Sequence, residues 1–145
     1  MPKIVVTGVD NSRTAAAAAR TAAELAAAYG ARLHILSAYG SFEAERISVG
    51  QEEILVSNEK TAEGVAHDVF VEIRQEFPDL EITFGPSAGT PGEALVTAAT
   101  ELDADVIVVG NKRVQGVSRI LGSIARYVAA HAPCDVYIAH THQRA

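Results

Sequence analysis

The chain has 145 residues, a formal net charge of −6 and 48% hydrophobic residues. This length fits one domain with a single core, and the ordinary charged fraction of 21% excludes the disordered class. The acidic balance disfavours nucleic acid and anionic membranes as main partners. A single cysteine, Cys134, excludes an internal disulfide framework and favours a reducing compartment. We therefore expect one cytoplasmic domain over residues 1–145, with no membrane-spanning segment.

Strand and helix patterns alternate along the chain. The first half predicts a strand at 3–9, a helix at 13–29, a strand at 33–38 and a long loop at 39–57 with room for a helical turn. A helix at 58–77, a strand at 80–84, a loop at 86–92 and a helix ending at 102 follow. The last part predicts a strand at 105–109, a helix at 122–131 and a strand at 136–140. Residues 141–145 are expected to be a frayed tail.

Local signals mark several of these boundaries. Asn11 or Ser12 is placed to cap the first helix, and Gly30 is placed to end it. Thr90 and Glu93 have the spacing of a capping box, with a proline at the first helical position between them. Strands this apolar need helices on both faces. The pattern therefore predicts an α/β fold: a three-layer, doubly wound sandwich around a five-stranded, mostly parallel sheet.

The segment VIVVGNKRVQGVSRILGS, residues 106–123, is the strongest candidate for chemistry. It passes from a predicted strand through Gly110 to three cations, Lys112, Arg113 and Arg119, and ends on Gly122-Ser123. A glycine after a buried strand permits close approach of a ligand, and a helix N-terminus attracts anions. The segment therefore resembles a cradle for a phosphate group. Asp10, after the neighbouring strand, could accept hydrogen bonds from a ribose hydroxyl pair.

Simpler interpretations stay open for the same residues. Gly110 and Gly122 could be turn and cap glycines only. The basic run could be a solvated loop, and Asp10 could serve only as a helix cap.

Four segments carry a resemblance to a known family: IVVTGVDNS, LHILSA, GTPGEALVTAATELDADVIVVG and LGSIARYVAAHAPCDVYIAH. Through them the chain resembles the universal stress protein family along nearly its whole length. The resemblance implies an adenine nucleotide alpha hydrolase-like sandwich that usually forms a homodimer through its last strand. It also implies a loop of the form Gly, two residues, Gly, nine residues, Gly and then Ser or Thr in members that bind nucleotides.

The sequence departs from that loop at two points. Arg113 stands where the second glycine is expected, and residues 114–121 are one residue short of the family spacing. A side chain at Arg113 would hinder close backbone approach, but a guanidinium can also bind a phosphate itself. Gly116 leaves an alternative register open.

Other family positions carry over residue by residue. The resemblance implies a nucleotide site at Gly8, Val9, Asp10, Ala38, Val109, Gly110, Lys112, Arg113, Gly122, Ser123, Ile124 and Ala125. Asp10 would bind the ribose, the backbone of Ala38 would read adenine, and residues 123–125 would meet the phosphates.

No catalytic constellation emerges from the sequence. Neither Gly-x-Ser-x-Gly nor a P-loop is present. His140 and His142 lack an evident third ligand, so we predict no metal site. The leading hypothesis is a stress-response or signalling protein that binds ATP or cyclic AMP, with Mg²⁺ possible beside ATP. The alternative is an interaction module of the same family without a nucleotide, and a nucleotide hydrolase relying on Asp10 is a weaker third option.

Overall fold

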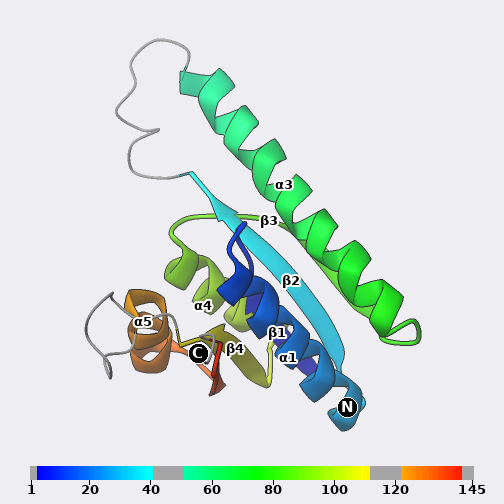
Figure 1. Cartoon of the computed structure of the whole chain (residues 1–145). Helices are drawn as coiled ribbons and strands as arrows, with labels where there is room; N and C mark the ends of the chain where they lie inside the picture. Colours follow the sequence, from blue (N-terminus) through cyan, green and yellow to red (C-terminus); the bar gives the residue numbers. More distant parts are fainter. Residues whose placement is uncertain (1–2, 41–50, 112–121, 142–145) are drawn as a thin grey trace, which may run out of the picture.

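The computed structural model of the chain describes residues 3–40, 51–111 and 122–141, the second range with its side chains from Glu59 onward (Figure 1). In chain order its elements are β1 (Ile4–Gly8), α1 (Arg13–Tyr29), β2 (Arg32–Tyr39), α3 (Gln51–Glu76), β3 (Ile82–Ala88), α4 (Pro91–Leu102), β4 (Val106–Gly110), α5 (Ser123–His131) and β5 (Asp135–Ala139).

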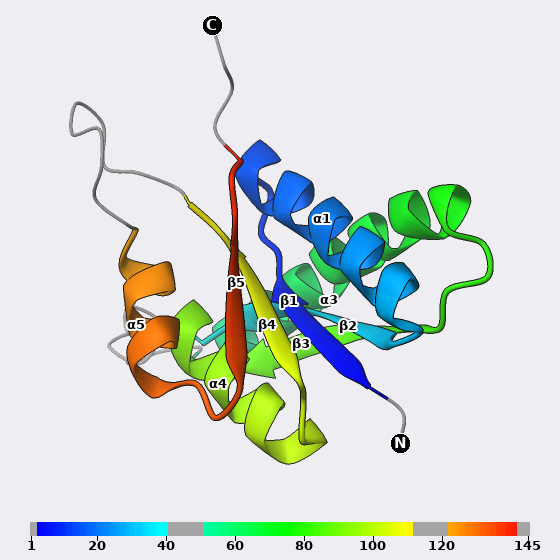
Figure 2. The ribbon, with the colours of Figure 1, turned by 90° about the horizontal axis from the view of Figure 1, so that it is seen from below.

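The strands form one parallel sheet in the order β3-β2-β1-β4-β5. Strand β1 pairs with β2 on one side, with Val6 opposite His34, and with β4 on the other, with Val6 opposite Ile107. Helices α1 and α3 cover one face of the sheet, and α4 and α5 cover the other (Figure 2). The predicted doubly wound α/β sandwich with a five-stranded parallel sheet is confirmed.

Each face of the sheet carries its own apolar cluster. In β1, Val5 faces α1 and α3, whereas Ile4 and Val6 face α4 and α5, as the strand's twofold alternation requires. The inner face of α1 is built from alanines, which let the helix lie close to the sheet. Five of them are buried: Ala18, Ala19, Ala22, Ala23 and Ala26. This close packing holds the start of α1 against the ends of β1 and β2.

The ends of α1 and α4 follow the predicted signals. The Ser12 hydroxyl accepts a hydrogen bond of 3.1 Å from the Ala15 amide, so Ser12 is the N-cap of α1. Gly30 ends that helix in the left-handed conformation, with φ 66°. Thr90 and Glu93 form the predicted capping box, with hydrogen bonds in both directions.

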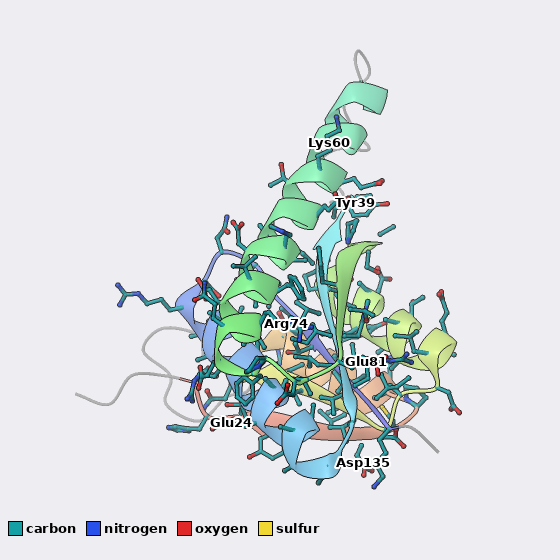
Figure 3. The ribbon with its side chains drawn as sticks, turned by 90° about the vertical axis from the view of Figure 1, so that its right-hand side faces the viewer. Glu24, Tyr39, Lys60, Arg74, Glu81 and Asp135 are labelled. Atoms are coloured by element: carbon teal, nitrogen blue, oxygen red, sulfur yellow. The ribbon has the colours of Figure 1, made fainter. Side chains whose placement is uncertain are left out.

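Helix α3 is longer than predicted. It begins at Gln51 rather than near Asn58, so the prediction of a loop up to residue 57 is wrong for residues 51–57. The segment QEEILVS has good helix propensity, but its three apolar residues are adjacent and give no helical period. Figure 3 shows Tyr39, at the end of β2, beside this helix, and a hydrogen bond with Glu59 raises the pKa of the Tyr39 hydroxyl.

Strand β3 also extends beyond its prediction. It was expected at 80–84 with a loop from Pro86, but it runs from Ile82 to Ala88. Its last residues follow the long β2, with Ala88 opposite Tyr39. A proline is tolerated because β3 is an edge strand, where one row of amides has no partner strand. Strand β5 begins one residue earlier than predicted, and Gly122 is the N-cap of α5 rather than its first residue.

Two glycine-to-alanine substitutions should change stability in opposite directions. Gly30→Ala forces a side chain into the left-handed region and should lower the free energy of unfolding by about 1 kcal/mol. Gly64→Ala lies within α3, where an added Cβ meets nothing within 4 Å, and should raise it by roughly 0.5–1 kcal/mol. Urea unfolding measures both. A Gly30→Ala protein as stable as the wild type would contradict the account of this helix end.

Candidate functional site

The strand order reverses beside β1. The chain passes from β1 to β2 and β3 on one side of the sheet, then returns to place β4 and β5 on the other side. The connections that leave β1 and β4 therefore diverge at the carboxyl edge of the sheet. In open α/β sheets this divergence opens a crevice in which ligands bind.

A cavity of about 430 Å³ occupies this point, and we call it the switch-point cavity. It is lined by the ends of three strands and the starts of three helices. The lining residues are Gly8, Val9, Asp10, Ser12, Thr14, Ala15, Ala18, Leu36, Ser37, Ala38, Pro91, Leu95, Val109, Gly110, Gly122, Ser123, Ile124 and Ala125. Its volume is within the range of small-molecule sites.

The carboxylate of Asp10 is held in place at the cavity wall. Its Oδ1 accepts a hydrogen bond of 2.7 Å from the Ser12 amide. Ser12 in turn caps α1, and its hydroxyl lies 3.1 Å from that of Thr14. The simpler interpretation of Asp10 as the helix cap is wrong, because Ser12 is the N-cap of α1 and Asp10 binds the amide of that cap residue. No hydrogen bond within the described residues engages Oδ2 of this exposed side chain, so that oxygen can accept from a ligand.

The N-terminus of α5 lies on the other side of the cavity. Its N-cap, Gly122, makes no side-chain hydrogen bond, whereas Ser12 and Thr90 cap α1 and α4 with theirs. The amides of the first turn of α5, at Ser123, Ile124 and Ala125, therefore have no capping side chain. Such amides, together with the helix dipole, favour an anion.

Ten of the twelve predicted site residues line this one cavity. They come from four segments: Gly8 to Asp10, Ala38, Val109 with Gly110, and Gly122 to Ala125. The other two, Lys112 and Arg113, lie outside the described residues, as do Arg119 and Gly116. The structure thus brings together every predicted residue that it describes.

Gly110 has a packing reason to be glycine. A Cβ at this position would lie 3.1 Å from the Thr141 hydroxyl and 3.6 Å from the Thr14 carbonyl oxygen. The next residue, Asn111, accepts hydrogen bonds from the Thr141 amide at 2.7 Å and from its hydroxyl at 3.1 Å. The cavity wall at Gly110 therefore lies close to Thr14 of α1, and the next residue ties it to Thr141, just after β5.

Eight lining residues were not among the predicted site residues. They are Ser12, Thr14, Ala15, Ala18, Leu36, Ser37, Pro91 and Leu95. Most are ordinary core or cap residues whose position in the cavity depends on the tertiary arrangement. Ser37 carried a detectable signal, because it is a hydroxyl residue in a mostly apolar strand, LHILSA, two residues after the buried Ile35. Asn111, which holds the cavity wall without lining it, carried no such signal, since an asparagine after a strand is a common loop residue.

A second cavity lies at the amino edge of the sheet and is less suited to an anion. It measures about 530 Å³ and is lined by residues that include Glu76, Asp79 and Glu81. Arg32 also lines it, but the guanidinium already pairs with Glu81 at 3.3 Å. Despite its larger volume, its carboxylates would repel a phosphate. The chemistry therefore favours the switch-point cavity.

The histidines near the C-terminus and Cys134 also carry side chains with the chemistry for a site. Among the described residues, no group of three or more potential metal-ligating side chains lies together. The Nδ1 atom of His140 lies 3.1 Å from Nδ2 of the Asn111 side chain. His142 lies outside the described residues. Burial raises the pKa of the Cys134 thiol, with Asp135 and Asp105 adding to the effect, and this disfavours the reactive thiolate.

Comparison with known proteins decides the family. Residues 1–140 match the sequence profile of the Universal stress protein family. The chain belongs to the universal stress protein family. It is 34% identical over 143 residues to the Universal stress protein Rv1636 of Mycobacterium tuberculosis strain H37Rv, a match that covers 96% of this chain and 97% of that protein.

Two solved structures of this family are particularly informative. One is a universal stress protein in complex with cAMP, with 32% identity, a TM-score of 0.69 and coverage of 97% of this chain and 98% of the other. The second is the universal stress protein from Archaeoglobus fulgidus in complex with dAMP, with 25% identity, a TM-score of 0.60 and coverage of 95% and 97%. Some universal stress proteins similar to this chain thus bind adenine nucleotides. No helix in the described part of the chain is long and apolar enough to cross a membrane.

Proposed function

We propose that this chain binds an adenine nucleotide in the switch-point cavity and acts as a stress-response or signalling component. The observation that carries the proposal is the convergence of ten predicted residues from four segments on one cavity. In the proposed arrangement the phosphate meets the first turn of α5, and Asp10 Oδ2 accepts from the ribose hydroxyls. The base then lies at the end of β2, against Ala38.

The ligand that fits best is a nucleotide with one phosphate group, such as cyclic AMP. The first turn of α5 offers one group of convergent amides, which suits a single phosphate. The similar structures with cAMP and dAMP also hold monophosphates. The cations Lys112 and Arg113 favour a longer phosphate chain, so ATP is the second candidate. With ATP, Mg²⁺ would bind mainly to the phosphates, as it does in many nucleotide sites.

Asp10→Ala tests the ribose contact. The variant loses one charged acceptor and should bind cyclic AMP about 1–2 kcal/mol more weakly than the wild type. Isothermal titration calorimetry on nucleotide-stripped protein, at two temperatures and with cyclic AMP, AMP and ATP in parallel, measures the affinity and ranks the ligands.

Asp79→Ala is the matched control. Asp79 is an exposed aspartate at the amino edge of the sheet and lies outside the switch-point cavity. Its removal should therefore leave the affinity for cyclic AMP unchanged. Equal affinity of the wild type and Asp10→Ala would remove Asp10 from the site. A wild-type protein that binds none of the three nucleotides would overturn the proposed function.

A homodimer through β5 is the second part of the proposal. Strand β5 is at the edge of the sheet and pairs with β4 on one side only. Two large apolar side chains on it are exposed, Tyr137 at 45% and Ile138 at 38%. An edge strand with such side chains on it is suited to pair with a second copy of itself.

Ile138→Lys should weaken this dimer, because a charge would be buried at the interface. Sedimentation equilibrium should show the dimer dissociation constant raised at least about tenfold, equivalent to about 1.4 kcal/mol. Val71→Lys, on α3, is the control, since Val71 has the same 38% exposure but lies away from β5. If both variants dimerise as the wild type does, the interface lies elsewhere.

A further inference from the structure

Ser37 is an unusual residue in the core. Among the described residues only two polar side chains are buried, Thr7 at 0% exposure and Ser37 at 5%. The Thr7 hydroxyl donates a hydrogen bond of 3.0 Å to the carbonyl oxygen of Val108. No side-chain hydrogen bond of Ser37 occurs within the described part of the chain. A buried hydroxyl without a hydrogen bond to the protein is unfavourable, so its presence needs a reason.

The place of Ser37 supplies that reason. Ser37 lines the switch-point cavity near the end of β2. It lies two residues after Ile35 and therefore faces the same side of the sheet, towards the alanines of α1. Two of those alanines, Ala15 and Ala18, also line the cavity. The hydroxyl is thus a polar group in a mostly apolar part of the wall, which is the usual form of a specificity contact in a small-molecule site.

The strand order indicates which part of a nucleotide reaches Ser37. In the sheet, β1 separates β2 from β4, and neighbouring strands are about 4.8 Å apart. The uncapped amides of α5 and Gly110 lie on the β4 side, and Asp10 follows β1 in the middle. A nucleotide with its phosphate at α5 and its ribose at Asp10 must place its base over the end of β2. The edge of a purine farthest from the sugar carries N1 and the group at carbon 6.

We propose that Ser37 is a specificity-determining residue that recognises the 6-amino group of the adenine base. The hydroxyl oxygen accepts a hydrogen bond from one N–H of the amino group, and the backbone of the neighbouring Ala38 stays available to the rest of that edge of the base. This inference rests on the proposed nucleotide function and adds to it the side chain that distinguishes the base. It also gives a role to a buried hydroxyl that makes no side-chain hydrogen bond within the described residues.

The test pairs a protein change with a ligand change. Affinities of the wild type and of Ser37→Ala are measured by calorimetry for two ligands, cyclic AMP and purine riboside 3′,5′-cyclic monophosphate, which has hydrogen in place of the 6-amino group. Ser37→Ala should lower the affinity for cyclic AMP at least about fivefold and change the affinity for the analogue less than about twofold. The melting temperature of ligand-free Ser37→Ala should equal or exceed that of the wild type, because no protein hydrogen bond is lost.

Thr7→Val is the control variant. Thr7 is the other buried hydroxyl, but it does not line the cavity and its hydrogen bond is structural. This substitution should lower the melting temperature and leave the affinity for both ligands unchanged. The two variants therefore have opposite effects if Ser37 contacts the ligand and Thr7 supports the fold.

Three outcomes would overturn the inference in distinguishable ways. Unchanged affinity of Ser37→Ala for cyclic AMP would show that the hydroxyl does not contact the base. An equal loss for both ligands would show that Ser37 shapes the wall without binding the amino group. In both cases the wild type still binds cyclic AMP, and the proposed function stands. A wild type that binds neither ligand would overturn the proposed function, and the inference about Ser37 with it.

Discussion

The pairing of β1 with both β2 and β4 is the constraint on which the rest of the structure depends. The alternation of β1 residues between two apolar clusters requires helices on both faces of the sheet. Because β2 and β4 lie on opposite sides of β1, the connections that follow β1 and β4 separate at the carboxyl edge. The switch-point cavity is a direct consequence of that separation. The buried alanines of α1 then allow the start of this helix to form one wall.

The cavity is also where two polar groups make no side-chain hydrogen bond within the described part of the chain. The cap of α5 makes no side-chain hydrogen bond, although α1 and α4 have capping side chains. Ser37 is buried without a side-chain hydrogen bond in the described residues, although Thr7 has one. Each feature leaves a hydrogen-bonding group at the cavity wall that a suitable ligand can engage. Such groups are typical of binding sites, where the ligand supplies the missing interactions.

The sequence was sufficient to predict the order of the elements and most of their boundaries. Helix caps at Ser12 and Thr90 and the stop at Gly30 depend on local chemistry, so they could be recognised directly. The start of α3 could not, because its apolar residues are adjacent and lack a period. The end of β3 depends on pairing with the long β2, which is a tertiary interaction and leaves little local signal. Ten predicted site residues do line one cavity. They could be predicted because the family resemblance identifies residues that are far apart in the sequence but close together in the fold.

The places of Ala18 and Leu95 in the cavity could not be predicted, because they depend on tertiary packing and not on local sequence. Both have the character of core residues, and only the packing of α1 and α4 against the strand ends brings them to the cavity. Asn111 shows a related limit. Its hydrogen bonds to Thr141 join two chain segments that are 30 residues apart, and no local pattern indicates that contact.

The central claim is that an adenine nucleotide binds at the switch point of the sheet. Its most direct test is a titration of ¹⁵N-labelled protein with cyclic AMP, followed by the amide chemical shifts of each residue. The account predicts the largest saturable shifts at residues 9–12, 36–38 and 122–125, which belong to three separate segments around one cavity. Shifts confined to the amino edge, at residues 26–32 and 76–81, or no shifts at millimolar ligand, would contradict it.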